Sequence, residues 1–310
     1  MRNATRHLEI SQIGSSLHTP YRERMSPQTI RRVGVVGTGV MAPGVVEVAA
    51  VAGFEVVVRG RSTGRANDVV DAISQRTERL VSKGRMDPEV RDSALARIST
   101  TELLRDLADC DLIIEMVVED LSIKRQLFAQ IETHIRPDAI LASNTSTLPI
   151  AELAMSTRHP DRVCGLHFFN PATAMKLVEI IKPLTASDDT IDAVRSFSEA
   201  CGREIVDVAD HAGFVVNALL FPYLNSAIAM AERGTASIED IDIAMRGGCG
   251  FPLGPFELLD HIGLDTSIKI LETLHNEFGD PSTVPHPMLK RLVAAGHLGR
   301  KSGRGFKQYS

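Results

Sequence analysis

A glycine-rich turn between a short apolar strand and an apolar helix is the feature that most constrains the fold. Residues 31–36, Arg-Arg-Val-Gly-Val-Val, predict a strand, and residues 40–51 predict an apolar-rich helix. A second apolar strand at 54–58 completes a β-α-β unit, which implies a parallel sheet. The turn between the first strand and the helix, Gly37 to Ala42, matches the G-x-G-x-x-[GA] pattern of dinucleotide-binding turns.

Each position of this turn has a physical role in binding a dinucleotide. Gly37 permits the tight turn, Gly39 lets a pyrophosphate approach the backbone, and the small Ala42 allows close packing of the helix on the strand. The N–H groups at the helix start, around Val40 and Met41, offer partial positive charge to the pyrophosphate. A glycine turn used only for packing is the alternative, but the β-α-β context favours dinucleotide binding.

The remaining pattern divides the chain into two domains. Strands and helices alternate up to about residue 212, whereas helices alone are predicted afterwards. Further strands are predicted at 111–115, 139–143, 162–169, 174–181 and 204–208, and later helices at 214–232, 237–246, 255–277 and 286–295. We therefore predict a flexible N-terminal extension over residues 1–29, a Rossmann-like, doubly wound α/β domain over residues 30–212, and an all-helical domain over residues 213–310.

The composition excludes several classes of function. The 310-residue chain carries a formal net charge of −5, which argues against a general binder of nucleic acids or anionic membranes. No apolar run approaches the ~18 residues of a membrane-spanning helix, and residues 1–29 lack the apolar core of a secretory signal. The four cysteines, at 110, 164, 201 and 249, are too widely spaced for a metal cluster, so we predict no metal site and a reduced, cytoplasmic protein.

Residues 162–181 predict a β-hairpin that pairs a histidine with a glutamate. An Asn-Pro turn signal lies between two apolar segments, and a hairpin centred near Thr173 places His167 directly opposite Glu179. Opposed residues in an antiparallel pair have Cβ atoms roughly 5 Å apart. The carboxylate could therefore hold one imidazole nitrogen and leave the other free to move a proton. By spacing alone, a purely structural His-Glu pair is equally compatible with the sequence.

The end of the second strand departs from the usual pattern of an NAD site. NAD-binding turns normally place Asp or Glu there, where it accepts hydrogen bonds from the ribose 2′-hydroxyl. This chain instead reads Val-Arg-Gly-Arg-Ser, with Arg59 and Arg61 in the region. Because guanidinium groups attract a 2′-phosphate, we slightly favour NADP over NAD as the cofactor. The alternative is that both arginines are solvated surface charges.

Several motifs in the right order resemble the L-3-hydroxyacyl-CoA dehydrogenase family, in particular the short-chain bacterial 3-hydroxybutyryl-CoA dehydrogenases. The resemblance extends over about residues 30–310. Its motifs are Gly-Thr-Gly at 37–39, Glu-Met-Val-Val-Glu-Asp at 115–120, Ser-Asn-Thr-Ser-Thr at 143–147, the segments 165–171 and 176–179, Gly-Phe-Val-Val-Asn at 213–217, Gly-Pro at 254–255 and Gly-Arg-Lys-Ser-Gly-Arg-Gly-Phe at 299–306.

The resemblance implies a role for individual residues. His167 matches the catalytic acid/base and Glu179 its orienting partner, while Ser146 and Asn217 match residues that contact the substrate. Arg65 is a candidate substrate contact only through its place after the second strand. Cofactor-side positions are matched by Glu119, Lys124, Asn144, Asn170 and Lys301. Taken alone, the serine segment could be a helix cap, the asparagine an ordinary helical residue and Lys124 a surface lysine.

The resemblance also implies a reaction and partners. It indicates hydride transfer between a nicotinamide cofactor and C3 of an acyl-CoA substrate, in a homodimer formed through the helical domain. The apolar residues of that domain could instead serve only its own core. Segment 170–175 departs from the more usual Pro-Ala-Pro-Val-Met form, which leaves open a substrate carried by an acyl carrier protein. A non-catalytic, crystallin-like relative is the third hypothesis, although all four catalytic positions are present.

Overall fold

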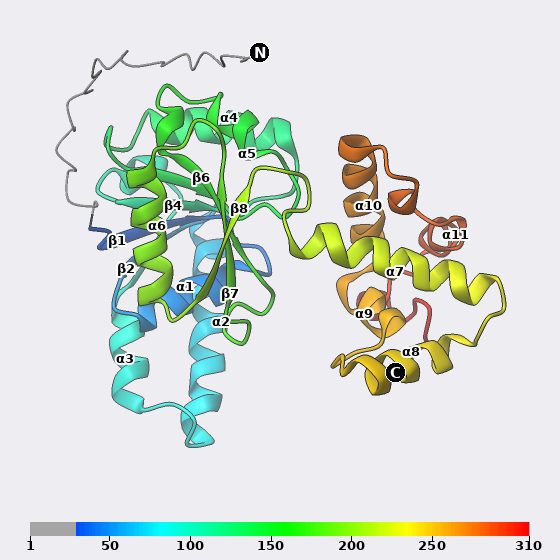
Figure 1. Ribbon diagram of the computed structural model, residues 1–310. Helices are drawn as coiled ribbons and strands as arrows, with labels where there is room; N and C mark the ends of the chain where they lie inside the picture. Colours follow the sequence, from blue (N-terminus) through cyan, green and yellow to red (C-terminus); the bar gives the residue numbers. More distant parts are fainter. Residues whose placement is uncertain (1–28, 310) are drawn as a thin grey trace, which may run out of the picture.

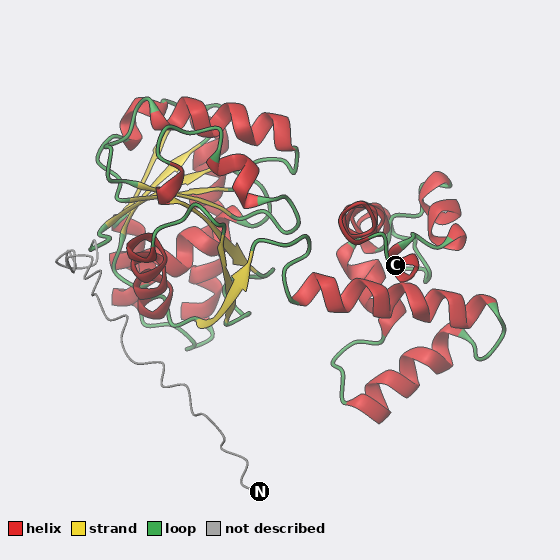
Figure 2. Ribbon diagram, turned by 45° about the horizontal axis from the view of Figure 1, so that its top comes forward, coloured by secondary structure: helices red, strands yellow, loops and turns green. Residues whose placement is uncertain are grey.

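The computed structural model describes residues 29–309, so the predicted extension over residues 1–29 lies almost wholly outside the described part. An eight-stranded sheet forms the centre of the first domain, with helices on both faces (Figures 1 and 2). Its strand order is β3-β2-β1-β4-β5-β6-β7-β8, and every neighbouring pair is parallel except β6 with β7. The strands are β1 Arg32–Val36, β2 Glu55–Arg59, β3 Ile98–Thr101, β4 Leu112–Glu115, β5 Ile140–Ser143, β6 Val163–Phe168, β7 Leu177–Lys182 and β8 Glu204–Ala209.

Two apolar layers sandwich this sheet because alternate strand residues point to opposite faces. Val35 and Ile114 pack against one layer, whereas their neighbours Val36 and Ile113 pack against the other. The first layer is covered by α1 Ala42–Val51, α2 Thr63–Ser82, α3 Pro88–Ala96 and α6 Asp188–Ala200. The second is covered by α4 Leu121–Glu132 and α5 Ile150–Ala154. The predicted doubly wound, Rossmann-like architecture is confirmed.

The second part of the chain is helical and has its own apolar core. Its helices are α7 Val216–Glu232, α8 Ile238–Cys249, α9 Pro255–Ile262, α10 Leu264–Phe278 and α11 Pro287–Ala294. Phe221 and Leu224 of α7 pack with Phe256 of α9 and Leu271 of α10 in one cluster. Figure 1 shows α7 leading away from the sheet into this group of helices. No helix of the described residues is long and apolar enough to span a membrane.

Three details differ from the sequence-based prediction. The single helix predicted at 255–277 is two helices, because Gly263 adopts φ 104° between α9 and α10. Strand β3 was not predicted, since its sequence Ile-Ser-Thr-Thr carries little apolar signal. The second hairpin strand begins at Leu177 rather than at residue 174, because the chain turns over Pro171–Met175 with both Ala174 and Met175 donating to the Pro171 carbonyl.

Candidate active site

The predicted hairpin register is confirmed. His167 of β6 lies opposite Glu179 of β7, and the imidazole Nδ1 is 2.7 Å from the carboxylate Oε2. Both side chains are buried, and Glu179 has no exposed surface at all. Because an ionised carboxylate only accepts hydrogen bonds, this contact requires the proton on Nδ1. The imidazole is thereby fixed in the tautomer that leaves Nε2 free to accept a proton.

The second carboxylate oxygen of Glu179 is held by the start of the helical domain. The backbone N–H groups of Val215 and Val216 both donate to Oε1, each at 3.0 Å. These residues begin α7, where the helix dipole also favours a negative charge. A buried carboxylate is costly unless hydrogen bonds compensate for lost water. Here two N–H groups and the imidazole supply that compensation, so Glu179 connects the two domains.

Aromatic rings flank the histidine. The centroid of the Phe169 ring lies 4.4 Å from the centroid of the His167 ring. The centroid of the Phe214 ring lies 5.6 Å from it. Within the described residues, no hydrogen bond involves the Nε2 atom of His167. The imidazole is therefore oriented by one carboxylate and two rings, and its outer nitrogen remains available to a substrate.

Ser146 and Asn217 meet beside this pair. The Asn217 side-chain amide donates to the backbone carbonyl of Ser146 at 3.3 Å. Ser146 lies in the loop after β5 and is half-buried, while Asn217 is buried in the first turn of α7. The structure thus brings together the four residues for which the sequence predicts catalytic or substrate roles. Those roles remain predictions.

A buried ionic network supports the serine loop. Lys124 of α4 is only 1% exposed, so it is not a surface lysine, and its ammonium lies 2.8 Å and 2.9 Å from the two Glu115 oxygens. It also lies 3.3 Å from Glu119, which in turn accepts the backbone N–H of Ser146 at 3.1 Å. Glu115 is a functional residue that the sequence pattern does not single out, although a charged residue at the end of a buried strand is a signal that could have identified it. The network fixes the loop that carries Ser146.

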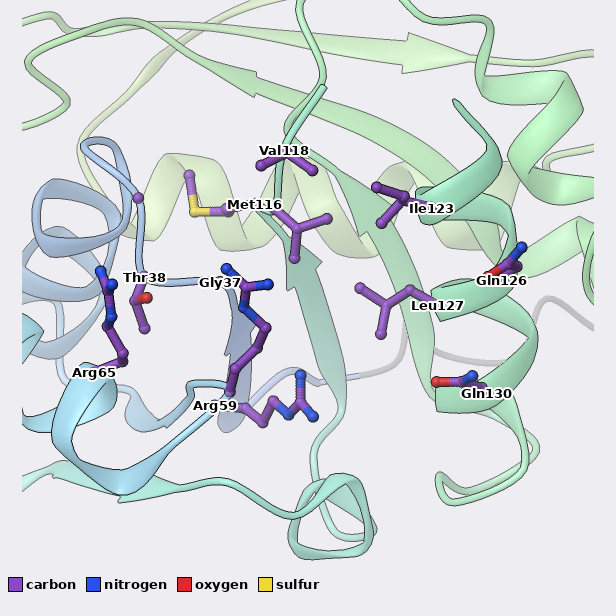
Figure 3. Close-up of a pocket in the computed structure, with 13 residues that line it drawn as sticks. Gly37, Thr38, Arg59, Arg65, Met116, Val118, Ile123, Gln126, Leu127 and Gln130 are labelled. Atoms are coloured by element: carbon purple, nitrogen blue, oxygen red, sulfur yellow. The ribbon is translucent and has the colours of Figure 1, made fainter. Parts of the chain in front are cut away.

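A cavity of about 500 Å³ opens over the glycine turn (Figure 3). Figure 3 shows Arg59 and Arg65 on one side and apolar residues of α4, Ile123 and Leu127, on the other. The remaining lining residues are Gly37, Thr38, Gly39, Arg61, Met116, Val117, Val118, Gln126 and Gln130. The lining fits a dinucleotide, because backbone N–H groups of the glycine turn could bind the phosphates, apolar side chains could contact a base, and cationic groups lie at the end of β2.

The turn itself tolerates only glycine at its first position. Gly37 adopts φ 129°, and a Cβ there would lie 2.4 Å from the Met116 carbonyl oxygen. At the start of α1, the N-cap Met41 makes no side-chain capping bond. A bound phosphate could therefore accept hydrogen bonds from N–H groups at this helix start.

The arginines around the cavity have no acidic partner. Within the described residues, no ion pair involves Arg59, Arg61 or Arg65, and Arg59 donates only to the Glu102 carbonyl at 3.2 Å. Burial, and then the neighbouring positive charge of Arg61, lower the pKa of Arg59 from its ordinary value. Arg65, for which the sequence predicts a substrate contact, lines the same cavity as the glycine turn, and its role stays a prediction. The three guanidinium groups therefore form a cationic wall of the cavity, and no carboxylate of the described residues pairs with their charges.

The remaining predicted cofactor residues lie in different surroundings. Val40, Met41 and Asn170 line a smaller cavity of about 170 Å³ beside the hairpin turn. The Asn144 side chain accepts the backbone N–H of Phe168 at 2.8 Å, which ties β6 to the loop after β5. Lys301 lies in the helical domain, where its ammonium is 2.6 Å from Asp265, outside the cavity over the glycine turn.

Comparison with known proteins identifies the family. The model of the 3-hydroxyacyl-CoA dehydrogenase NAD binding domain matches residues 32–211, and that of the 3-hydroxyacyl-CoA dehydrogenase C-terminal domain matches residues 213–309. The chain belongs to the 3-hydroxyacyl-CoA dehydrogenase family. It is therefore an oxidoreductase with a Rossmann-type domain for a nicotinamide cofactor.

Individual relatives align over nearly the whole chain. A 3-hydroxybutyryl-CoA dehydrogenase of Mycobacterium tuberculosis is 45% identical over 282 residues, which is 90% of this chain and 99% of that protein. One from Clostridioides difficile is 40% identical, with coverage of 90% and 99%. The crystal structure of (S)-3-hydroxybutyryl-CoA dehydrogenase from Ralstonia eutropha superposes with a TM-score of 0.88 at 40% identity, covering 91% of this chain and 100% of that one.

Proposed function

We propose that this dehydrogenase acts on short-chain substrates, transferring a hydride between a nicotinamide cofactor and C3 of a 3-hydroxyacyl-CoA such as 3-hydroxybutyryl-CoA. The observation that carries the catalytic part is the buried His167–Glu179 pair, in which Glu179 holds one imidazole nitrogen at 2.7 Å and the other nitrogen has no hydrogen-bond partner among the described residues. The short-chain assignment is supported by the relatives, which are named for 3-hydroxybutyryl-CoA and not for substrates on carrier proteins.

The geometry supports a simple division of work. The nicotinamide, when bound, supplies the hydride acceptor or donor. Nε2 of His167 takes the hydroxyl proton as C3 is oxidised, and returns it when the ketone is reduced. Glu179, held by hydrogen bonds from the Val215 and Val216 N–H groups, stabilises the imidazolium that forms. The Ser146 hydroxyl and the Asn217 amide then position the substrate oxygens.

The cofactor we propose is NADP. The position that would carry the ribose-binding carboxylate holds none, and Arg59, Arg61 and Arg65 face the cavity without acidic partners. A 2′-phosphate would neutralise this cationic wall, whereas the 2′-hydroxyl of NAD would leave it unpaired.

The location we propose is the cytoplasm. The cysteines at 110, 164, 201 and 249 are free, which supports a reducing compartment.

The experiment that tests the activity compares the wild-type enzyme with His167→Gln in acetoacetyl-CoA reduction. The wild type should turn over, and the variant should fold but lose at least ~10²-fold in kcat, since general acid–base catalysis contributes that much. Folding is checked by urea unfolding, and substrate binding by KM. The same ketone on an acyl carrier protein serves as the control substrate. Near-normal turnover of the variant, or a clear preference for the carrier-bound ketone, would refute the proposal.

A further inference from the structure

The turn that joins the two domains has an unusual backbone. Phe214 adopts φ 51°, and it is the sole non-glycine residue with positive φ among residues 29–309. Gly213 before it also has positive φ, at 73°. A left-handed backbone is unfavourable for a residue with a side chain and persists only where the surroundings enforce it. Such strain at a domain junction calls for a functional explanation.

The left-handed turn aims two N–H groups at one point. Val215, directly after Phe214, is right-handed at φ −96° and ψ −53°. A left-handed residue next to a right-handed one makes successive N–H groups converge into a concave anion-binding nest. The anion here is the Oε1 oxygen of Glu179, at 3.0 Å from both the Val215 and Val216 nitrogens.

Packing holds the strained residue in place. Phe214 is 6% exposed and belongs to the apolar layer that α4 and α5 cover. Its backbone N–H donates to the His211 carbonyl at 3.1 Å, and the Gly213 carbonyl accepts from Ala218 at 3.0 Å. A Cβ on Gly213 would lie 2.6 Å from the Leu274 side chain. The turn is therefore fixed from both domains at once.

We propose that the Gly213–Phe214 turn is the positioning element of the catalytic pair, and that Phe214 is a positioning residue through its backbone conformation. The left-handed turn fixes Glu179, and Glu179 fixes the His167 imidazole at 2.7 Å. This proposal rests on the catalytic role of His167 proposed above. It adds that proton transfer depends on the backbone conformation of Phe214, beyond the contact that its ring makes with the imidazole.

A series of substitutions at Phe214 separates the backbone role from packing. Each variant lacks the ring that flanks His167, so the variants are compared with one another and not only with the wild type. Valine is β-branched and strongly disfavours positive φ, leucine tolerates it about as phenylalanine does, and glycine adopts it freely. Packing ranks the same variants differently, because leucine and valine both retain much of the apolar volume that glycine loses. A positioning role thus predicts the worst catalysis for Phe214→Val, and a packing role predicts it for Phe214→Gly.

The measurements are kcat and KM for acetoacetyl-CoA, the urea midpoint, and the low-field proton NMR signal of the His167 Nδ1–H, assigned by its absence in His167→Gln. We expect Phe214→Val to lose ~10- to ~100-fold in kcat with little change in KM, since small misplacements of catalytic groups have effects of that size. Its Nδ1–H signal should broaden or disappear. Phe214→Leu and Phe214→Gly should keep that signal and more of the turnover, even though Phe214→Gly unfolds at the lowest urea concentration.

Other results for these variants would overturn either the positioning role of Phe214 or the catalytic role of His167. Equal kcat for the valine and leucine variants, with the glycine variant lowest, would overturn the positioning role while leaving the catalytic pair intact. If Phe214→Val does not fold, the test is the Nδ1–H signal of folded Phe214→Gly. Loss of that signal would also overturn the positioning role, because glycine adopts the left-handed backbone freely. Leu107→Ala, which removes packing from the same apolar layer, should lower the urea midpoint without the loss in kcat. Normal turnover of His167→Gln would instead refute the catalytic pair itself.

Discussion

Arg61 is the residue whose charge has the most direct bearing on cofactor choice. It follows the end of β2, lines the cavity over the glycine turn, and has no acidic partner among the described residues. We predict that Arg61→Ala lowers kcat/KM for NADPH by about 10- to 100-fold and leaves that for NADH nearly unchanged, because hydrogen bonds to charged groups contribute about 1.5–3 kcal/mol. The measurement is the ratio of the two kcat/KM values.

The matched control for this prediction is Arg233→Ala, which removes an exposed arginine at the end of α7 in the other domain. It should change neither constant. A wild-type enzyme with a clear preference for NADH, or an Arg61→Ala variant that uses NADPH as well as the wild type, would contradict the proposed cofactor.

Some of the site was predictable residue by residue, and some was not. The pairing of His167 with Glu179 followed from the hairpin, because strand register depends on short-range spacing that the sequence displays. The left-handed backbone of Phe214 carries no sequence signal, since phenylalanine ordinarily avoids that region. The burial of Lys124 also escaped prediction. The positive charge of buried Lys124 is balanced by Glu115 and Glu119, and only the tertiary structure brings these carboxylates next to α4.

Among the elements, the β6–β7 hairpin depends on one close approach. A Cβ on Gly165 of β6 would lie 2.7 Å from the Cβ of Ile181 on β7, two positions before the His167–Glu179 pair. Gly165→Ala should therefore force the strands apart and lower the free energy of unfolding by about 1–3 kcal/mol, as overpacking does. Urea unfolding followed by circular dichroism measures the change, and kcat should fall because the catalytic pair shares the hairpin.

Gly64→Ala is the control for added volume. Gly64 lies in the first turn of α2, and a Cβ there meets nothing within 4 Å. Alanine should leave stability unchanged or raise it by up to ~1 kcal/mol, since glycine is the poorer helix residue. Equal stability of the Gly165→Ala variant and the wild type would show that the strands can separate freely at this point.

Elements were predicted best where burial on both faces makes a strand continuously apolar. Strands β1, β4, β5 and β6 satisfy this condition and were found close to their true bounds. The edge strand β3 was missed because its half-polar sequence resembles a loop. The break between α9 and α10 was missed for another reason: a single glycine within an apolar helical pattern does not reveal whether the chain bends there.

At the scale of the whole molecule, one face of α7 remains apolar and uncovered. Phe221, Leu224 and Ile228 are buried in the helical core, so part of the apolar sequence serves internal packing. Leu219 is nevertheless 73% exposed and Met230 40% exposed, and Phe251 packs edge-on against Tyr223 of the same helix while staying 42% exposed itself. Contiguous exposed apolar groups are typical of interaction surfaces. We propose that a second copy of this chain covers them.

A homodimer through this face makes a direct prediction for mass in solution. The wild type should sediment with roughly twice the 33.7 kDa of one chain, and Leu219→Asp should shift it to the single-chain mass, because a buried unpaired carboxylate opposes association. Val90→Asp is the matched control, since Val90 is 43% exposed on α3 in the other domain and should leave the mass doubled. A wild-type monomer, or a Leu219→Asp dimer as stable as the wild type at equal concentration, would show that the exposed face of α7 does not join two chains.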